Sequence, residues 1–550
     1  MRARVLKIHP KDNLIVALDH LTAGEEVHYD EKYYILQNDV PAKHKFVTEN
    51  LQTGDDIYMY GVLVGKATQP IAKGAPITVG NVKHSAHDFA LGKRRTAWQT
   101  PDISRWQEST FMGYPRANGQ VGVANYWLFI PLVFCENRNI QLIRDAMVKE
   151  LGYDRTRSVD FDLKSLLSKH QQGASAEDLL STEIVITAEE MQHKRTFPNV
   201  DGIKFLTHEG GCGGTRTDSN TLCALFAGYI THPNVAGATI LSLGCQNAEV
   251  RILQEEISKR DPHFSKPLYI LEQQKSKSER DFIGEAIKKT FVGLTEANKI
   301  ERRPAPLSKL VLGLECGGSD GFSGISANPA VGHAADLLVA LGGSVILSEF
   351  PELNGVEQEL TDRCVDDATA EKFIRIMRAY SASAEAVGSG FDANPSPGNI
   401  KDGLITDAIK SAGAAKKGGT SPVTDVLDYT EPVTKPGLNL LCTPGNDVES
   451  TTGLAGSGAS IILFTTGLGT PTGNPVAPTL KISSNTALAQ RMADIIDINA
   501  GTIISGEDTI ENKGEEILDY IIRTASGDYL PKAVAIGQDD FIPWKRGVSL

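Results

Sequence analysis

The 550-residue chain is most strongly constrained by a strand–turn–helix pattern around residue 316. An apolar run at residues 310–314 leads into a glycine-rich turn at 315–324, and a helix-like apolar pattern follows at 334–341. In open α/β sheets, ligands bind beyond the carboxyl ends of the strands, where glycines let backbone N–H groups approach a substrate closely. Because the turn carries a thiol, carboxylates and hydroxyls, it is the first place where we expect chemistry.

The rest of the chain predicts several domains, since one hydrophobic core rarely grows to this length. Residues 1–85 contain short apolar runs broken by glycines, which indicates a small all-β module. Residues 86–115 lack periodicity and are expected to form a linker. From residue 116 onward, strand and helix patterns alternate, which predicts α/β domains at 116–305 and 306–550 with mostly parallel, Rossmann-like sheets. Residues 381–422 are rich in Gly, Ser and Pro and are expected to form a long active-site loop.

Composition limits the partners. A net charge of −13 argues against nucleic-acid binding, which needs clustered Lys and Arg. No apolar stretch is long enough for a signal peptide or a membrane span. The seven cysteines have no close-spaced pairs, which favours reduced thiols over a disulfide framework. We therefore expect a cytoplasmic protein, a homodimer, that binds a small molecule and neither nucleic acid nor a membrane.

Four motifs give the chain a family resemblance. They are ECGGSDGFSGISANPAVG at 315–332, NPSPGN at 394–399, PGND at 444–447 and DINAGT at 497–502. In this order they resemble the altronate dehydratase and galactarate dehydratase family, closer to the altronate branch. The similarity covers nearly the whole chain and includes residues 113–123 and 243–245.

The resemblance implies a hydro-lyase that removes water from D-altronate to give 2-keto-3-deoxy-D-gluconate, with Fe²⁺ as cofactor. It also implies that the amino-terminal module is a β-clip (SAF-like) domain. The alternatives are a galactarate-type dehydratase, a lyase for another sugar acid or hydroxy acid, and a sugar-acid-binding protein without turnover.

Two residue sets are candidate metal ligands. Cys212, Cys245 and Cys316 each follow a predicted strand and adjoin glycine, and soft thiolates favour iron or an iron–sulfur cluster. The alternative for each is a small buried residue at a tight turn. Oxygen ligands, which also suit Mn²⁺ and Mg²⁺, form a competing set: Glu349, Glu352, Asp320, Asn399 and Asp447.

Two histidines are candidates for proton transfer, and the alternative for either is a surface or hydrogen-bonded structural histidine. His44 matches a histidine of the family's amino-terminal module, and its neighbours Lys43 and Lys45 are expected to hold the substrate's carboxylate. His208 follows a predicted strand and precedes Cys212. The glycine-rich turn and nearby loops supply the remaining candidates, with Asp320 and Ser323 as catalytic groups and Ser319, Asn328 and Asn399 as substrate-binding groups.

The chain departs from the family around residues 209–212 and at Gln246. It has Glu-Gly-Gly-Cys where the family commonly has Tyr-Gly-Cys after the histidine, and Gln246 where Glu commonly follows Gly-Cys. These changes alter the local charge, so we expect them to bear on substrate choice.

Overall fold

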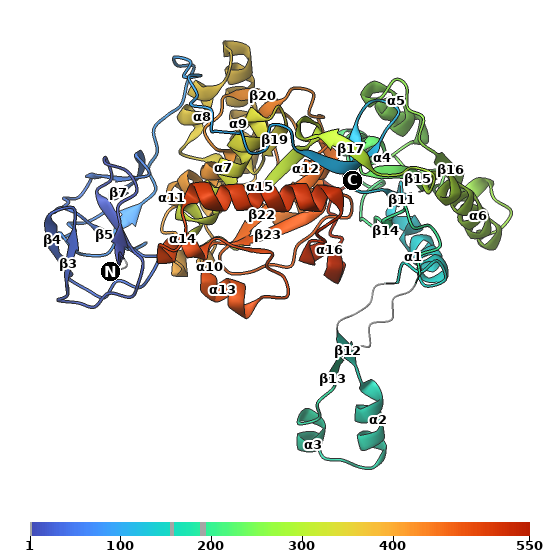
Figure 1. Ribbon diagram of the computed structural model, residues 1–550, viewed down its shortest axis with the longest axis horizontal. Coiled ribbons are helices and arrows are strands. Elements are labelled where there is room, and N and C mark those ends of the chain that lie inside the picture. Colours follow the sequence, from blue (N-terminus) through green and yellow to red (C-terminus); the bar gives the residue numbers. More distant parts are fainter. Residues whose placement is uncertain (1–2, 155–158, 188–193) are drawn as a thin grey trace.

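A computed structural model describes residues 3–154, 159–187 and 194–550 of the chain (Figure 1). The amino-terminal β-module consists of three small antiparallel sheets around a core that includes Ile15 and Phe46. Glycines with positive φ, such as Gly24 at 77° and Gly54 at 93°, end the runs and keep the strands short. The strands are β1 (Val5–Leu6), β2 (Leu14–Ala17), β3 (Glu26–Tyr29), β4 (Lys32–Ile35), β5 (Lys45–Val47), β6 (Asp56–Met59), β7 (Val62–Ala67) and β8 (Val82–Lys83).

Residues 86–109 cross the surface of the carboxyl-terminal domain. The backbone N–H of Arg95 donates to the carbonyl of Asp362, and the indole N–H of the buried Trp106 donates to Asp519 at 2.9 Å. The end of the expected linker is a strand, β9 (Thr110–Pro115), which pairs with β10 (Val121–Gly122) and with β17 (Arg303–Pro306). The strand contains Gly113 and Pro115, residue types that are rare in strands, which is why the sequence did not reveal it.

The first α/β domain contains a four-stranded parallel sheet in the order β14-β11-β15-β16. Its strands are β11 (Tyr126–Pro131), β14 (Gly202–Phe205), β15 (Val235–Ser242) and β16 (Leu268–Glu272). Helices α4 (Arg216–Thr231) and α5 (Val250–Arg260) cover the face with Leu128 and Ile130. Helices α1 (Asn137–Met147) and α6 (Glu279–Ala297) cover the face with Trp127 and Phe129. The sheet is therefore buried on both sides, as a parallel sheet requires.

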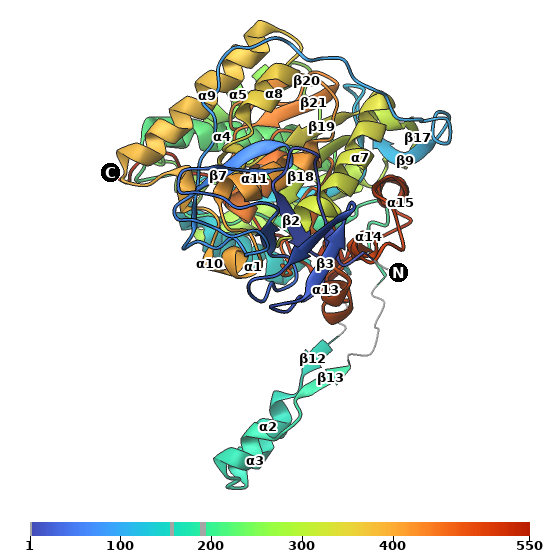
Figure 2. The same ribbon diagram turned by 90° about the vertical axis from the view of Figure 1, so that its left-hand side faces the viewer.

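An arm projects from this domain (Figures 1 and 2). It consists of a hairpin, β12 (Val159–Phe161) and β13 (Val185–Thr187), and of helices α2 (Leu163–Gln171) and α3 (Ala176–Leu180). Asp162 caps α2, and Ser175 and Asp178 form a capping box at the start of α3. These local caps stabilise two helices that have no buried residues.

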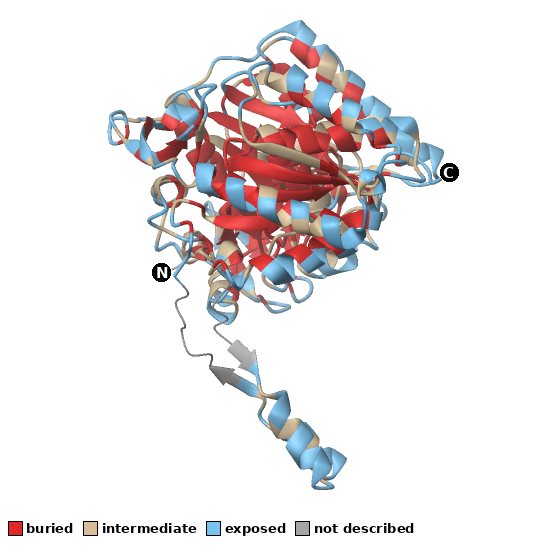
Figure 3. Cartoon of the chain, turned by 90° about the vertical axis from the view of Figure 1, so that its right-hand side faces the viewer, coloured by how far each residue is buried: buried red, intermediate tan, exposed pale blue. Residues whose placement is uncertain are grey.

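The carboxyl-terminal domain is built on a seven-stranded parallel sheet in the order β20-β21-β19-β18-β22-β23-β24. Its strands are β18 (Val311–Cys316), β19 (Ser344–Leu347), β20 (Val423–Leu427), β21 (Gly437–Leu441), β22 (Ile461–Thr466), β23 (Thr479–Ser483) and β24 (Ile498–Asn499). Figure 3 shows the buried strands at the centre and exposed helix faces outside. The predicted α/β fold with mostly parallel sheets and a small β-module is therefore confirmed.

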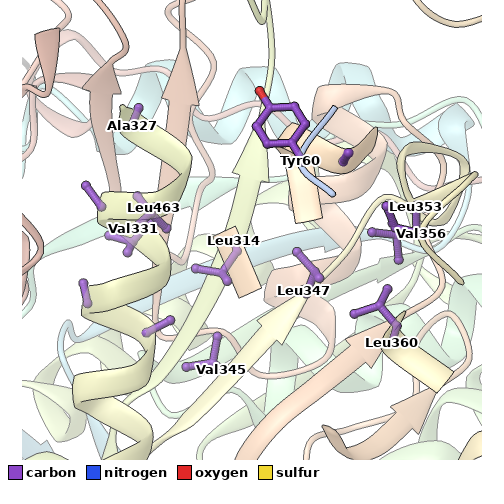
Figure 4. Close-up of a cluster of buried hydrophobic side chains, with 14 of the residues drawn as sticks. Tyr60, Leu314, Ala327, Val331, Val345, Leu347, Leu353, Val356, Leu360 and Leu463 are labelled. Carbon is purple, nitrogen blue, oxygen red and sulfur yellow. The ribbon is translucent and has the colours of Figure 1, made fainter. Parts of the chain in front are cut away.

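Both faces of the seven-stranded sheet are covered. Helices α7 (Ala327–Ala340) and α15 (Ile510–Ser526) pack on one face, in a core that reaches Tyr60 of the β-module (Figure 4). Helix α12 (Asp447–Gly456) packs on the other face and against α4 of the first α/β domain. At this contact a Cβ atom on Gly228 would overlap the carbonyl oxygen of Gly456, so only glycine allows the two helices to come so close.

The segment 381–422 is not a long loop. Helix α9 (Asp367–Ala386) continues into it, and α10 (Pro397–Lys401) and α11 (Asp407–Ala414) follow, with Thr406 capping α11. Helix α11 buries mainly small residues, so its hydrophobicity is low although it is packed inside the domain. Among the described residues, no helix combines the length and apolar character needed to cross a bilayer.

Candidate active site

A cavity of about 520 Å³ lies at the carboxyl ends of the seven-stranded sheet. The chain runs from the central β18 to its neighbour β19, then to the edge strand β20 and back to β21, and it crosses to β22 on the other side of β18. Such a reversal of strand order opens a crevice in which ligands of α/β proteins bind. Cys316 ends β18, Glu352 follows β19, Asp447 follows β21 and Leu468 follows β22, and all four line the cavity.

Cys316, Glu349 and Glu352 form a compact group of buried metal-ligand atoms, all within 4.8 Å of one another. The Sγ atom of Cys316 lies 3.2 Å from Oε2 of Glu352 and 4.0 Å from Oε1 of Glu349. Glu349 has a positive φ of 67°, which costs roughly 1–3 kcal/mol and is characteristic of functional sites. Glu349 lies in the turn after β19, and with this backbone conformation its carboxylate lies beside the end of β18, where it accepts from the N–H of Cys316 at 3.1 Å.

Two lysines, Lys417, which is buried, and Lys410, which is partly exposed, hold the far side of these carboxylates. The Nζ atom of Lys417 lies 2.6 Å from Oε2 of Glu349, and that of Lys410 lies 2.5 Å from Oε1 of Glu352. The Nδ2 atom of Asn394 also donates to Oε1 of Glu352, at 3.1 Å. The other oxygen of each glutamate faces the thiol, so one oxygen per carboxylate is oriented for a shared ligand.

The site carries more acidic than basic groups. Burial and then the charge of Glu349 raise the pKa of Glu315 well above its usual value. Burial raises the pKa of Glu349 to about 7 and, together with the nearby carboxylates, raises that of the Cys316 thiol. Burial opposes ionisation of Glu352 as well, but Lys410 and Lys417 hold its pKa below the usual value.

These residues fit a divalent cation. The Oε1 atom of Glu315 is buried without a hydrogen-bond partner, and burial raises the pKa of Glu315 and of Glu349 because it penalises their charged forms. A cation would stabilise the ionised forms. One thiolate with two carboxylates suits Fe²⁺ or Mn²⁺ better than Mg²⁺, which takes oxygen ligands.

The wall of the cavity carries both polar and aromatic side chains. Asn394, Asn399 and Asp447 line it together with Tyr380 and Phe391. Burial and then the charge of Glu352 raise the pKa of Asp447, which brings this carboxyl group closer to the range of a general base at neutral pH.

Asp447 lies directly over the end of β18. A Cβ atom on Gly317 would overlap its carboxylate, so this glycine of the motif is required for the close approach. The arrangement places Asp447 next to the residue that follows Cys316.

Of the predicted substrate-binding residues, Asn399 lines the cavity and donates to the carbonyl of Ser319 at 2.7 Å. Asn328 is buried in α7, where it donates to the carbonyl of Gly413 and accepts from the hydroxyl of Thr465. Asn328 therefore joins packed elements beneath the site and does not line the cavity.

The predicted residues of the β-module lie in a domain interface. Lys43 pairs with Asp320 at 3.0 Å and with Asp402 at 2.8 Å, and the fully buried Lys45 donates to the carbonyl of Gly403 at 2.6 Å. Burial lowers the pKa of Lys45 to about 7. The Nε2 atom of His44 lies 3.0 Å from the carbonyl of Lys401, and burial lowers its pKa. None of the three lines the cavity, so their expected contact with the substrate's carboxylate stays a prediction.

Asp320 and Ser323 belong to the same interface. Asp320 is fully buried and accepts hydrogen bonds from Ser323, Ser484 and Asn485. With Lys43 it forms the polar centre of the contact between the β-module and the carboxyl-terminal domain. Neither residue lines the cavity, so the expectation that they act directly on substrate gains no support from their position.

The expected set of three cysteines is not one site. Cys316 is buried at the end of β18, whereas Cys212 and Cys245 are exposed and follow β14 and β15 of the four-stranded sheet. The two sheets are separate, which the sequence spacing does not reveal. Cys316 does lie beside Glu349, which was predicted as a ligand from the competing set.

His208 is also removed from the cavity. Its Nδ1 atom accepts from the N–H of Gly210, so Nε2 carries the proton and donates to the carbonyl of Pro131 at 2.7 Å. Burial lowers its pKa to about 4. With both ring nitrogens bound to backbone, His208 joins two loops.

Sequence reasoning missed Lys410, Lys417 and Asn394. All three lie in the segment expected to be a loop, and no spacing connects them with Glu349 or Glu352. The only usable signal was the NPSPGN motif, which contains Asn394 and Asn399.

Comparisons with known proteins agree along the whole chain. Residues 3–85 match the altronate/galactarate dehydratase SAF domain, residues 113–298 the second domain of D-galactarate dehydratase/altronate hydrolase, and residues 307–549 the carboxyl-terminal domain of D-galactarate/altronate dehydratase. The chain is 33% identical to altronate dehydratase of Escherichia coli, over 99% of both chains, and 33% identical to that of Bacillus subtilis, over 95% of both. It is 30% identical to galactarate dehydratase (L-threo-forming) of Escherichia coli, over 95% of this chain and 92% of that one.

Proposed function

The chain belongs to the altronate and galactarate dehydratase family, and we propose that it is a hydro-lyase that converts D-altronate to 2-keto-3-deoxy-D-gluconate and water. The 33% identity to altronate dehydratases over nearly the full length carries this proposal. Galactarate is the alternative substrate, supported by the 30% identity to a galactarate dehydratase.

We place the reaction in the cavity at the end of β18, with Fe²⁺ held by Cys316, Glu349 and Glu352. The compact arrangement of these ligand atoms and the excess of buried acidic groups support the assignment. When bound, the ion supplies positive charge that stabilises an enolate and assists departure of a hydroxyl group.

The chain's own residues supply binding and proton transfer. Asn394 and Asn399 present amide groups to hydroxyls of the sugar acid, and Lys410 adds positive charge at the cavity wall. Asp447 accepts the proton from C2, since its carboxylate lines the cavity and burial raises its pKa. The crevice around them keeps these groups partly shielded from water, which strengthens their interaction with developing charge.

The test compares three variants purified without oxygen. Glu352→Gln should lose most bound metal together with activity on altronate. Asp447→Asn should keep its metal but lose roughly 10²- to 10⁴-fold in kcat, the usual contribution of a positioned proton-transfer group. Glu449→Gln is the matched control, because Glu449 lies on the same helix, is half-buried and does not line the cavity.

Formation of 2-keto-3-deoxy acid from altronate and from galactarate is measured for each protein. Turnover of neither compound by the metal-loaded protein would overturn the proposed reaction. Full metal content in Glu352→Gln would move the metal site elsewhere, and unchanged kcat in Asp447→Asn would exclude that residue as the base.

A further inference from the structure

The cysteines of the chain fall into two groups. All seven lie among the described residues and all are free thiols; four are buried, and three, Cys135, Cys212 and Cys245, are exposed. Free cysteine is among the residue types most often buried, so three exposed cysteines in one protein need an explanation. We call these three residues the cysteine trio.

The topology brings the cysteine trio to one edge. In the four-stranded parallel sheet, β14, β11 and β15 are consecutive neighbours, and their carboxyl ends lie at the same edge. Cys212 follows β14, Cys135 follows β11 and Cys245 follows β15, each within a few residues of its strand. One cysteine is thus supplied by each of three adjacent loops.

Hydrogen bonds tie these loops together. The N–H of Phe134, next to Cys135, donates to the carbonyl of Gly210, and the N–H of Ala248 donates to the carbonyl of Gly211. His208 also bridges the loops after β14 and β11 through its contacts with Gly210 and Pro131. The loops that carry the cysteine trio are therefore held in fixed mutual positions.

The surroundings suit a bulky inorganic ligand. Gly211, Gly213 and Gly244 have positive φ angles, and they flank Cys212 and Cys245 without adding side chains at the surface. The amide of Gln274 donates to the sulfur of Cys245 at 3.2 Å. A cavity of about 680 Å³, lined by Cys212 and Glu209, opens beside this edge.

We propose that the cysteine trio binds an iron–sulfur cluster of the [4Fe–4S] type, with one iron left without a cysteine ligand. Thiolates on separate loops can each bind a different iron, and amide hydrogen bonds to sulfur are among the interactions that tune such clusters. In the part of the chain that the structure describes, the three sulfur atoms of the trio do not all lie within 4.8 Å of one another. This spacing argues against a single zinc ion bound by all three. In ligand exchange with a preassembled cluster–thiol complex, three S–H bonds of the cysteines and three Fe–S bonds to the exogenous thiolates break, three Fe–S bonds to the cysteines form, and the three protons leave on the released thiols.

This site is separate from the Cys316 site and does not depend on the proposed function. The test uses the full chain purified without oxygen, before and after incubation with a preformed [4Fe–4S]–thiol complex. Iron and acid-labile sulfide are counted per chain, and the reduced and oxidised proteins are examined by electron paramagnetic resonance. We expect about four iron atoms and about four sulfides per chain beyond the single ion at Cys316.

The variants Cys135→Ala, Cys212→Ala and Cys245→Ala should each lower labile sulfide about tenfold or more, because each removes a ligand. Cys364→Ala, at a buried cysteine of the other α/β domain, is the control and should keep the sulfide. Cys316→Ala should lose the single ion and keep the sulfide, which separates this site from the proposed catalytic one. Circular dichroism checks that each variant is folded.

Three results would overturn the proposal. They are a protein that holds no labile sulfide either as purified or after incubation with the cluster complex, zinc bound by the cysteine trio in place of iron and sulfide, and a disulfide between two members of the trio in the oxygen-free protein. Equal loss of sulfide in Cys364→Ala would also contradict it, since that residue is far from the loops in the topology of the fold.

Discussion

A methyl group at Gly321 should loosen the β-module from the carboxyl-terminal domain. A Cβ atom there would lie 2.5 Å from the carbonyl oxygen of Lys43 and 3.0 Å from that of Asp402. Gly321 is not among the glycines with positive φ, so the substitution Gly321→Ala adds no backbone strain of its own. Its effect is therefore the collision at the interface.

The size of the effect follows from the contacts that must move. The new Cβ atom and the carbonyl oxygen of Lys43 must move apart from 2.5 Å to at least 3.0 Å, the lower limit for real Cβ contacts, so Lys43 shifts by about half an ångström. The shift disturbs the ion pairs of Lys43 with Asp320 at 3.0 Å and with Asp402 at 2.8 Å. Hydrogen bonds to charged groups contribute about 1.5–3 kcal/mol each, and both are weakened rather than lost. We expect the contact to weaken by about 2–3 kcal/mol, or roughly 30- to 150-fold in the docking equilibrium.

Hydrogen exchange of the amides in β5 measures this loss, because docking adds to the protection of the module. Exchange in Gly321→Ala should be roughly 30- to 150-fold faster than in the unchanged protein. Gly398→Ala is the matched control, since a Cβ atom at Gly398 would meet nothing closer than 3.8 Å. Equal protection in both variants would show that the Lys43 contact does not hold the module, and would refute the reasoning.

Three further outcomes are expected. Removal of metal with a chelator should lower the melting temperature by roughly 5–10 °C, with recovery on adding Fe²⁺, because a ligand at a hundred times its Kd stabilises by about 2.7 kcal/mol; an unchanged melting temperature would contradict a bound cation. Burial lowers the pKa of His232 to about 3, so the folded protein keeps this histidine neutral while the unfolded chain binds a proton below about pH 6.5. The free energy of unfolding in urea should therefore fall by about 2 kcal/mol between pH 6.5 and pH 5, and this fall should be absent in His232→Asn. Gly228→Ala should destabilise the contact of α4 with α12 by about 1–3 kcal/mol in calorimetry, whereas Gly284→Ala, with open space at its Cβ position, should be neutral or stabilising.

The parts of the fold that could be predicted are those with strong local patterns. The runs at Leu14–Ala17, Gly202–Phe205 and Ile461–Thr466 are mostly apolar, and each is a strand. The antiparallel pair of β9 and β17 was missed because β17 contains two prolines and β9 contains a glycine and a proline. Helix α10 was missed because it has five residues and begins with proline and glycine. Helix α11 was missed because most of its buried side chains are small.

Residues of the site could be predicted only where the local sequence around each one indicated a role. Cys316 stood out because it lies in a glycine-rich turn after an apolar run, and Glu349 because it follows the next strand. Lys410 and Lys417 could not be predicted from the sequence, since their pairing with Glu352 and Glu349 depends on how α11 and the short turn after it pack against the sheet. The grouping of Cys316 with Cys212 and Cys245 failed for the same reason: similar local sequences end strands of two different sheets.

The glycine-rich turn explains why neighbours in sequence have different roles. Cys316 and Asp320 are four residues apart, yet Cys316 lines the cavity while Asp320 faces Lys43 of the β-module. Between them Gly318 has a positive φ of 60°, and the N–H groups of Gly467 and Leu468 donate to its carbonyl, so the turn changes direction at a fixed point. Ser319, between the two sides, accepts the hydrogen bond of Asn399 from the cavity wall. Because the same turn bounds the cavity and receives the module, a displaced module can act on the cavity through Ser319 and Asn399, without any residue of the module touching the substrate.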